Sequence, residues 1–414
     1  MAPTATITPE EIIRELSASD SVILASRFFE SSSAGLLEEQ IRICSIPAPP
    51  FGEGARAEHL RQRFVECGLL EARLDAEGNC VALRRGRSLN PLIVISAHLD
   101  TVFPEGTDCS VRRERGKLFA PGIADDGCGL VALIAIARAL QGCAIQTEGS
   151  LLFVGTVGEE GEGNLRGARY LLQEGEWAGS VDGFVSLDGA GVERITHAAL
   201  GSRRYRMRLQ GVGGHSWGDF GAANPVHALG RAIARLASYP APKDPRTTFN
   251  VGRIEGGSGV NVIPTEATMD VDLRSASAEE LHRLDAFFRR AAREAVDDEN
   301  FMRRAGDPSL ELDLKLIGDR PSGETPADSF IVQLAIEATR VVGRDPRLDR
   351  SSTDSNIAIS LGIPAITLGA GGTSSNSHTI EEWYDPRGRE AGLLRALLVL
   401  LGLVGREWQP GISR

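Results

Sequence analysis

The sequence predicts an α/β protein in which a smaller α+β domain is inserted into a domain with a mainly parallel sheet. Three observations support this fold class. The chain has 414 residues, which is more than one domain usually holds. Apolar strand-like runs alternate with helical patterns in the first part of the chain and return near its end. Between them, from about residue 198, the strand-like runs become half polar.

The first part of the chain carries four expected helices and four expected strands. The helices are 10–16, 36–44, 55–67 and 129–140, and the strands are 80–84, 92–96, 150–156 and 183–187. The runs 92–96, 150–156 and 183–187 are apolar enough to be buried on both faces, as strands of a parallel sheet are. Because ligands collect at the carboxyl ends of such strands, the residues that follow them are candidates for a site.

The middle of the chain has a different order of elements. Residues 202–211 alternate polar and apolar, which predicts a half-exposed antiparallel strand. A helix (225–237), two strands (248–254 and 265–273), a helix (278–296) and a strand (310–317) follow. This β-α-β-β-α-β order is that of a ferredoxin-like unit.

The domain boundaries follow from these changes of pattern. We expect an inserted domain over residues 198–318 and a discontinuous first domain formed by 1–197 and 319–414. The last part of the first domain contains an expected helix at 330–342, a buried strand at 365–368 and a buried terminal helix at 391–404.

Charge and cysteine usage restrict the partners and the compartment. The net charge is −11, from 45 basic and 56 acidic residues, which argues against nucleic acid or an anionic membrane as a partner. The six cysteines lie in the first 150 residues without CxxC spacing. This pattern is typical of reduced, buried thiols. No apolar targeting segment occupies residues 1–20, and no membrane-length apolar run occurs. We therefore expect a cytoplasmic protein.

Five short patches carry histidine and carboxylate side chains, the ligands of divalent metals in hydrolytic sites. They contain His98 and Asp100, Asp125 and Asp126, Glu159 and Glu160, Asp188, and His378. His98, Glu159 and Asp188 each follow an expected buried strand. Two histidines with three or four carboxylates exceed the needs of one zinc ion and suit a pair of metals. Any one patch alone could be structural: His98 an ordinary histidine, the aspartates turn or helix-cap residues, and His378 a surface-loop residue. Their joint appearance, in order and at strand ends, favours a site.

The spacing within the patches suggests separate roles. Alternate residues of an extended segment share a face, so Asp100 can accept the second ring N–H of His98 and fix its tautomer. The adjacent acids Glu159 and Glu160 repel each other unless a cation or proton intervenes. This repulsion would be relieved if Glu160 bound a metal ion and Glu159 took a proton from the attacking water. In the Asp125–Asp126 pair, one carboxylate could bridge two metals, or the pair could form a turn with a helix cap.

Eight short segments together resemble a known family. They are SAHLDTVF (96–103), APGIADDG (120–127), GEEG (158–161), LD (187–188), GGHS (213–216), GVNVIP (259–264), DLRS (272–275) and SHT (377–379). As an ensemble they are similar to the M20 metallopeptidases, which include tripeptidase T, glutamate carboxypeptidase, aminoacylase and succinyl-diaminopimelate desuccinylase. The resemblance extends from about residue 46 to about residue 382, and residues 1–40 match less clearly.

The resemblance implies a site with two divalent metal ions, expected to be zinc, with cobalt and manganese as alternatives. It implies that Asp125 bridges the ions through a cis peptide bond to the next residue and that Glu159 is the general base. The remaining implied roles are His98 and Asp188 as ligands of one ion, Glu160 and His378 as ligands of the other, and Asp100 as the residue that orients His98.

The resemblance also implies that residues 198–318 form a lid, or dimerisation, domain and that the protein is a homodimer. His215 would reach an active site, commonly that of the partner subunit, and stabilise the oxyanion. Asn261 and Arg274 would hold the backbone or terminal carboxylate of the substrate, since a guanidinium fork suits a carboxylate. A salt bridge within the lid is the alternative for Arg274.

The implied activity is hydrolysis of an amide bond in a small peptide, with the terminus that is read left open. An N-acyl or N-carbamoyl amino acid amidohydrolase and a non-catalytic metal-binding protein are the alternatives. Gly127-Cys128-Gly129 stands where many relatives carry a lysine and small residues, which leaves substrate preference open. Cys128 is expected either to be sensitive to oxidation or to pack as a small residue at a helix start.

Overall fold

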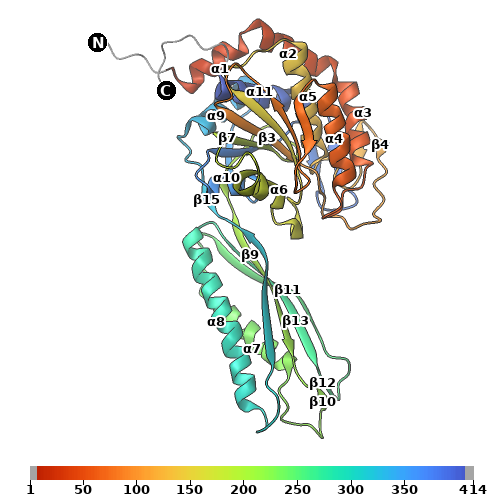
Figure 1. Cartoon of the computed structure of the whole chain (residues 1–414), viewed down its shortest axis with the longest axis vertical. Helices are drawn as coiled ribbons and strands as arrows, with labels where there is room; N and C mark the ends of the chain where they lie inside the picture. Colours follow the sequence, from red (N-terminus) through yellow and green to blue (C-terminus); the bar gives the residue numbers. More distant parts are fainter. Residues whose placement is uncertain (1–6, 406–414) are drawn as a thin grey trace, which may run out of the picture. The chain divides into compact units, whose positions relative to one another are not determined.

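The computed structural model describes residues 7–405 and divides them into two compact units. The first unit contains the described residues up to Ala199 and from Glu324 onward, and the inserted unit is Leu200–Gly323 (Figure 1). These boundaries lie a few residues after those expected from the sequence. Residues 1–6 and 406–414, which the sequence analysis assigned to the first domain, lie outside the described residues.

The first unit is built around a nine-stranded sheet in the order β1-β2-β6-β3-β7-β17-β8-β15, with β16 pairing to β8. Its strands are β1 (Leu70–Leu74), β2 (Cys80–Arg84), β3 (Leu92–His98), β6 (Ser150–Thr156), β7 (Gly183–Leu187), β8 (Arg194–Ala199), β15 (Gly323–Glu324), β16 (Arg347–Ser351) and β17 (Ala365–Leu368). The four central strands β6, β3, β7 and β17 are parallel to one another. The predicted α/β class with a mainly parallel sheet is confirmed.

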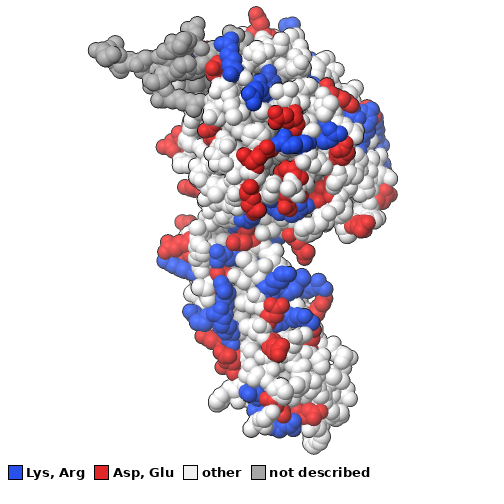
Figure 2. Space-filling model, in the orientation of Figure 1, with Lys and Arg blue, Asp and Glu red and all other residues white. Residues whose placement is uncertain are grey.

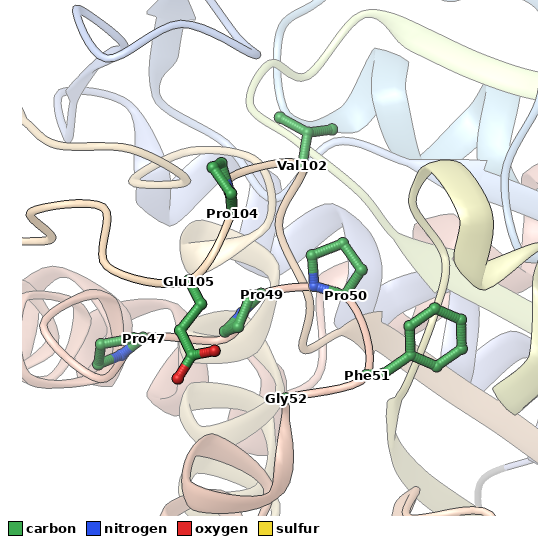
Figure 3. Close-up of a pocket in the computed structure, with 8 residues that line it drawn as sticks. All are labelled: Pro47, Pro49, Pro50, Phe51, Gly52, Val102, Pro104 and Glu105. Atoms are coloured by element: carbon green, nitrogen blue, oxygen red, sulfur yellow. The ribbon is translucent and has the colours of Figure 1, made fainter.

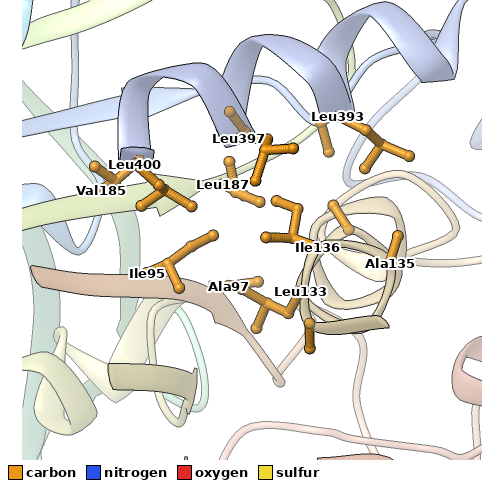
Figure 4. Packing of buried hydrophobic residues seen from close by; sticks show 14 of the residues in the cluster. Ile95, Ala97, Leu133, Ala135, Ile136, Val185, Leu187, Leu393, Leu397 and Leu400 are labelled. Carbon is orange, nitrogen blue, oxygen red and sulfur yellow. The ribbon is translucent and has the colours of Figure 1, made fainter. Parts of the chain in front are cut away.

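Helices cover both faces of this sheet. They are α1 (Pro9–Ser17), α2 (Asp20–Ser31), α3 (Ser33–Cys44), α4 (Gly54–Glu66), α5 (Gly127–Gly142), α6 (Arg166–Arg169), α9 (Phe330–Val341), α10 (Ser355–Ser360) and α11 (Arg389–Val404). Successive side chains of a strand point to opposite faces, so Ile95 joins one buried cluster and Val94 another. In the larger cluster, Ile95 and Val185 pack with side chains of α5 and α11 such as Leu133 and Leu397 (Figure 4).

The inserted unit contains a four-stranded antiparallel sheet in the order β11-β13-β9-β14. Its elements are β9 (Gly201–Gln210), α7 (Pro225–Ala237), β11 (Thr247–Gly256), β13 (Glu266–Ser275), α8 (Ala278–Met302) and β14 (Glu311–Arg320), with a short ribbon of β10 (Gly214–His215) and β12 (Val262–Ile263). The order β-α-β-β-α-β agrees with the ferredoxin-like prediction. Met207, Met269 and Phe288 belong to its own buried cluster, so this unit has a separate core.

The other face of the inserted sheet is lined by ion pairs between neighbouring strands. Arg206 on β9 is opposite Asp270 on β13, and their side chains are 2.8 Å apart. Arg208 is opposite Thr268, and its side chain reaches diagonally to Glu266 at 2.6 Å. Opposite charges placed across a strand pair stabilise its register. Basic and acidic side chains accordingly alternate on the visible face of this unit (Figure 2).

Several short elements were not predicted. Helix α2 was missed, although its buried residues Val22, Ala25 and Phe29 have helical spacing. A four-stranded sheet of β18 (Thr373–Ser375), β19 (Trp383–Asp385), β5 (Lys117–Phe119) and β4 (Arg112–Glu114) was also missed. Its strands have three residues each, too few for a periodic signal. The strand expected at 92–96 is longer than predicted and ends at His98.

Candidate metal centre

Three of the sequence-predicted site residues lie at one edge of the central sheet. His98 is the last residue of β3, Asp188 directly follows β7, and Glu159 lies in the loop after β6. Strand β3 is parallel to both β6 and β7 and lies between them. The carboxyl ends of the three strands therefore meet, as the sequence pattern predicted.

The loop before α5 and the loop after β18 bring the remaining candidate ligands to this edge. Potential ligand atoms of His98, Asp125 and Asp188 lie within 4.8 Å of one another, and so do those of Asp125, Glu160 and His378. One oxygen of Asp125 is 2.9 Å from Nε2 of His98, and its other oxygen is 3.2 Å from Nε2 of His378. Asp125 thus belongs to both groups and presents one oxygen to each.

The charges of these groups explain why the cluster suits a cation. Burial and the nearby charge of Asp125 raise the pKa of Asp188 to about 7. Hydrogen bonds to Asp125 and Glu160 raise the pKa of His378 to about 10. Burial opposes the charged form of His98, but hydrogen bonds to Asp100 and Asp125 raise its pKa well above the usual value. The carboxylates of the cluster thus stabilise positively charged groups that lie between them. Imidazole nitrogens and carboxylate oxygens at these separations fit divalent metal ions.

Asp100 is fully buried and holds two neighbouring segments together. Its carboxylate accepts hydrogen bonds from the backbone N–H of Glu159 at 2.9 Å and of Glu160 at 2.7 Å. Nδ1 of His98 is 3.0 Å from the carbonyl oxygen of Asp100 and 3.6 Å from the carboxylate of the same residue. Asp100 was expected to orient His98 through its carboxylate. The shorter contact is made by the backbone, and the carboxylate, 3.6 Å from the ring, also fixes the Glu159–Glu160 segment.

The two adjacent aspartates have different surroundings. The carboxylate of Asp126 is buried and accepts N–H groups of His98 at 3.1 Å, Gly129 at 3.1 Å and Gly189 at 3.2 Å. It therefore caps α5 and ties the ends of β3 and β7 to the helix. Asp126 therefore forms the expected helix cap, while Asp125 faces the two histidines. The peptide bond between them is cis, as the resemblance implies.

The Gly127-Cys128-Gly129 segment is shaped by close packing at the start of α5. A Cβ atom at Gly129 would lie 2.3 Å from the carboxylate of Asp126, and one at Gly127 would lie 2.4 Å from the sulfur of Cys44. The thiol of Cys128 is buried and lies 3.0 Å from the carbonyl oxygen of Ala124. Burial raises its pKa well above the usual value, which favours the packed-residue reading over a reactive thiolate.

Comparison with known families identifies the chain. The model of the family described as peptidase family M20/M25/M40 matches residues 94–405, which include every ligand candidate. The chain belongs to this family. It is a metallopeptidase-type hydrolase that acts on peptide or amide bonds, and the predicted resemblance is confirmed.

Individual relatives lie within the same family. A Bacillus subtilis protein named YqjE is 25% identical over 350 residues, which are 81% of this chain and 90% of the relative. A succinyl-diaminopimelate desuccinylase from Methylibium petroleiphilum is 29% identical over 58% of this chain and 67% of its own length. Both matches are distant, so they support the family rather than a substrate.

Solved structures show the same fold. The crystal structure of aminopeptidase PepT from Bacillus cereus matches with a TM-score of 0.72 and 21% identity, covering 90% of this chain and 99% of that chain. The YXEP protein of Bacillus subtilis, described as a dinuclear metal binding peptidase, matches with a TM-score of 0.65 and 17% identity, covering 91% of this chain and 99% of that chain.

Some residues that shape this M20 site were not predicted from the sequence. Arg56 is buried and donates hydrogen bonds to the carbonyl oxygens of Ile46 at 2.6 Å and of Leu99 at 2.8 Å. It thereby fixes the residue between the two site residues His98 and Asp100. The buried Glu382 accepts three backbone N–H groups of the 122–125 segment. Their partners are distant in sequence, so no local pattern could have revealed them.

The other three predicted site residues belong to the inserted unit. His215 on β10 is exposed, and its Nδ1 accepts the backbone N–H groups of Trp217 at 3.2 Å and Gly218 at 3.3 Å. In the neutral ring the proton is therefore on Nε2, which makes that atom a donor. The carbonyl oxygen of Asn261 accepts the N–H of Ser216 at 3.0 Å, so Asn261 adjoins the His215 segment. Arg274 on β13 pairs through Nε with Asp272 at 2.6 Å.

A separate cavity of about 550 Å³ lies in the first unit beside the loop that follows Asp100. Its walls come from two loops, and Figure 3 shows the four prolines, Phe51 and Glu105 among the residues that line it. The loops are joined by the N–H of Thr101, which donates to the carbonyl oxygen of Ala48 at 3.0 Å. None of the metal-ligand candidates lines this cavity, so the chemistry belongs to the carboxylate and histidine cluster.

Among residues 7–405, no helix combines the length and apolar character that crossing a bilayer requires.

Proposed function

We propose that this protein hydrolyses an amide bond of a small peptide with two divalent metal ions, expected to be zinc. The observation that carries the proposal is the position of Asp125, whose two oxygens face different histidines. His98 and Asp188 would hold one ion, Glu160 and His378 the other, and Asp125 would bridge them. When bound, such ions supply Lewis acidity toward water and toward a carbonyl oxygen.

Glu159 is proposed as the general base. Its side chain is 5% exposed, and one of its oxygens lies within 4.8 Å of ligand atoms of His98 and Glu160. Its backbone N–H is held by Asp100, which limits movement of the loop. From this position the carboxylate would take the proton of the attacking water and pass it to the leaving nitrogen.

The residues of the inserted unit are proposed to bind the reacting group and the substrate. Because Nδ1 of His215 accepts backbone N–H groups, its Nε2–H is available as a donor to a developing oxyanion. Asn261, next to the His215 segment, would hold the substrate backbone. Arg274 would hold a substrate carboxylate, in competition with its ion pair to Asp272. We also propose that the protein is a homodimer in which His215 serves the active site of the partner subunit.

Mixed dimers test the placement of His215. The single variants H215N and E159Q are each expected to lose activity, by about 10²–10³-fold for H215N, as for the loss of one oxyanion donor. If His215 acts in the partner's site, co-expressed and purified H215N/E159Q mixed dimers regain about half of the wild-type activity, because one of two sites is intact. Mixed dimers as inactive as both parents would contradict the placement, and a monomer by light scattering would contradict the dimer.

The proposed substrate is a small peptide, with an acylated amino acid as the second candidate. A peptide is favoured because the chain belongs to a peptidase family and matches aminopeptidase PepT along nearly its whole length. The alternative is an N-acyl amino acid amidohydrolase. It is favoured by the relatives named succinyl-diaminopimelate desuccinylase, which are 24–30% identical to this chain.

A substrate panel distinguishes the two functions. The protein, loaded with zinc, cobalt or manganese, would be incubated with free-amine di- and tripeptides, C-terminal glutamyl amides and N-acyl amino acids. Chelator-sensitive cleavage is expected, and mass spectrometry of the fragments would show which bond is cut. Cleavage of acyl amino acids without cleavage of peptides would favour the amidohydrolase. No cleavage and no metal uptake would contradict both.

A further inference from the structure

Glu382 is neither a proposed metal ligand nor the proposed general base, and its surroundings differ sharply from those of the adjacent Glu381. Glu382 is 0% exposed, whereas the side chain of Glu381 is 67% exposed and lies 3.5 Å from Arg112. The two glutamates are chemically identical, so the fold selects one of them for burial.

The carboxylate of Glu382 accepts three hydrogen bonds from the loop that carries Asp125. Its Oε2 accepts the backbone N–H of Gly122 at 2.9 Å. Its Oε1 accepts the N–H groups of Ala124 and Asp125, both at 2.8 Å. Both oxygens are therefore used by the backbone, and among the described residues Glu382 belongs to no group of potential metal ligands. A buried carboxylate with these partners holds a loop in place instead of binding the ion.

The backbone of Glu382 connects the same loop to His378. Its N–H donates to the carbonyl oxygen of Thr379 at 3.1 Å, which closes the turn after His378. Its carbonyl oxygen accepts the N–H of Ala120 at 3.1 Å, and β19, which starts at the next residue, pairs with β5. The His378 turn and the Asp125 loop, more than 240 residues apart in sequence, are thus joined at Glu382.

The opposite side of the Asp125 loop is held by different groups. Nε2 of Gln40 donates to the carbonyl oxygen of Ile123 at 2.6 Å, and the thiol of Cys44 is 3.6 Å from the carbonyl oxygen of Gly122. These contacts hold carbonyl groups, while Glu382 holds N–H groups of the same loop. Loss of the carboxylate would leave buried N–H groups without their partner and let the loop shift.

We infer that Glu382 is a positioning residue that fixes the carboxylate of Asp125 relative to His378 and thereby sets the affinity of the metal ion between them. The inference rests on the two-metal site proposed above. It concerns how the site is held, because the Glu382 carboxylate contacts the backbone of the Asp125 loop and, among the described residues, belongs to no group of potential ligands.

The test compares E382Q and E382A with the matched control E381Q. Each full-length protein is stripped of metal with chelator and titrated with Zn²⁺, with affinities taken from competition with a zinc indicator. In E382Q one of two zinc equivalents is expected to bind about 10–100-fold more weakly, as when an outer partner of a ligand is lost. The amide oxygen can still accept two N–H groups, so E382A is expected to lose more. E381Q is expected to bind as the wild type does.

Two further readouts separate positioning from a purely structural role. Under saturating Co²⁺ the visible absorption spectrum of E382Q should differ from that of the wild type, since the coordination geometry changes. At saturating metal, kcat should fall about tenfold or more while KM changes little, as expected for misplaced reacting groups. Thermal unfolding of the metal-free proteins shows whether the fold is intact.

The outcomes are distinguishable. A wild-type protein that binds no metal would overturn the proposed function itself. A wild type with two zinc equivalents, together with E382Q that binds both equally well and has an unaltered Co²⁺ spectrum, would overturn only the positioning role. Metal-free E382Q and E382A that are both unfolded would assign Glu382 to the fold and would also overturn the inference.

Discussion

Replacing Glu159 with glutamine is expected to lower kcat by about 10²–10⁴-fold, the usual contribution of a positioned general base. The amide cannot take a proton from water, yet it has nearly the same shape as the carboxylate. Glu159 is buried beside the ligand candidates and its backbone is held by Asp100, so the loop should stay in place. Zinc content, measured by elemental analysis, is therefore expected to equal that of the wild type.

The exposed Glu162, on the turn directly after Glu160, provides a matched control for this substitution. E162Q should retain wild-type kcat and metal content. Turnover by E159Q within a few-fold of the wild type would contradict the general-base role. Loss of metal together with activity would instead indicate that Glu159 is a metal ligand. Its potential ligand atom lies in a group with those of His98 and Glu160.

Replacing Asp125 with asparagine is expected to abolish activity by loss of metal. Each oxygen of Asp125 faces a different histidine, so the substitution affects both ion sites at once. The loss of zinc affinity should exceed the roughly 10–100-fold typical of removing an outer partner of a ligand. Metal-dependent stabilisation should disappear as well. Zinc at 100 times its Kd adds about 2.7 kcal/mol to the free energy of unfolding of a protein that binds it. Calorimetry of each variant with and without zinc measures this difference.

Substitution of the neighbouring Asp126, compared with substitution of Asp125, tests this assignment. Its carboxylate caps α5 and accepts the N–H groups of His98 and Gly189, but it belongs to no group of potential ligands among the described residues. D126A should lower the melting temperature of the metal-free protein, since replacing a helix-cap residue by alanine costs about 0.5–2 kcal/mol. D125N should lose the metal, so metal affinity distinguishes the two carboxylates. Equal metal affinity in D125N and the wild type would contradict the bridging role.

The parallel core was predictable because its signal is local. The parallel strands at 150–156, 183–187 and 365–368 were placed with the bounds that the structure has. Continuous apolar runs of this length mark strands buried on both faces. The paired strands β5 and β19 have three residues each and are joined across more than 260 residues, so nothing in either segment marks them.

The sequence by itself determined which candidate residues come together, because residues that follow buried parallel strands meet at one edge of the sheet. His98, Glu159 and Asp188 could be chosen on that basis. Only the tertiary structure decided how they are used. It assigned Asp125 to the histidines and Asp126 to the helix cap, turned the carbonyl of Asp100 toward His98, and buried Glu382 instead of Glu381. Hydrogen-bond partners of this kind are set by the packing of distant segments, and such packing leaves no periodic trace in the sequence around either partner.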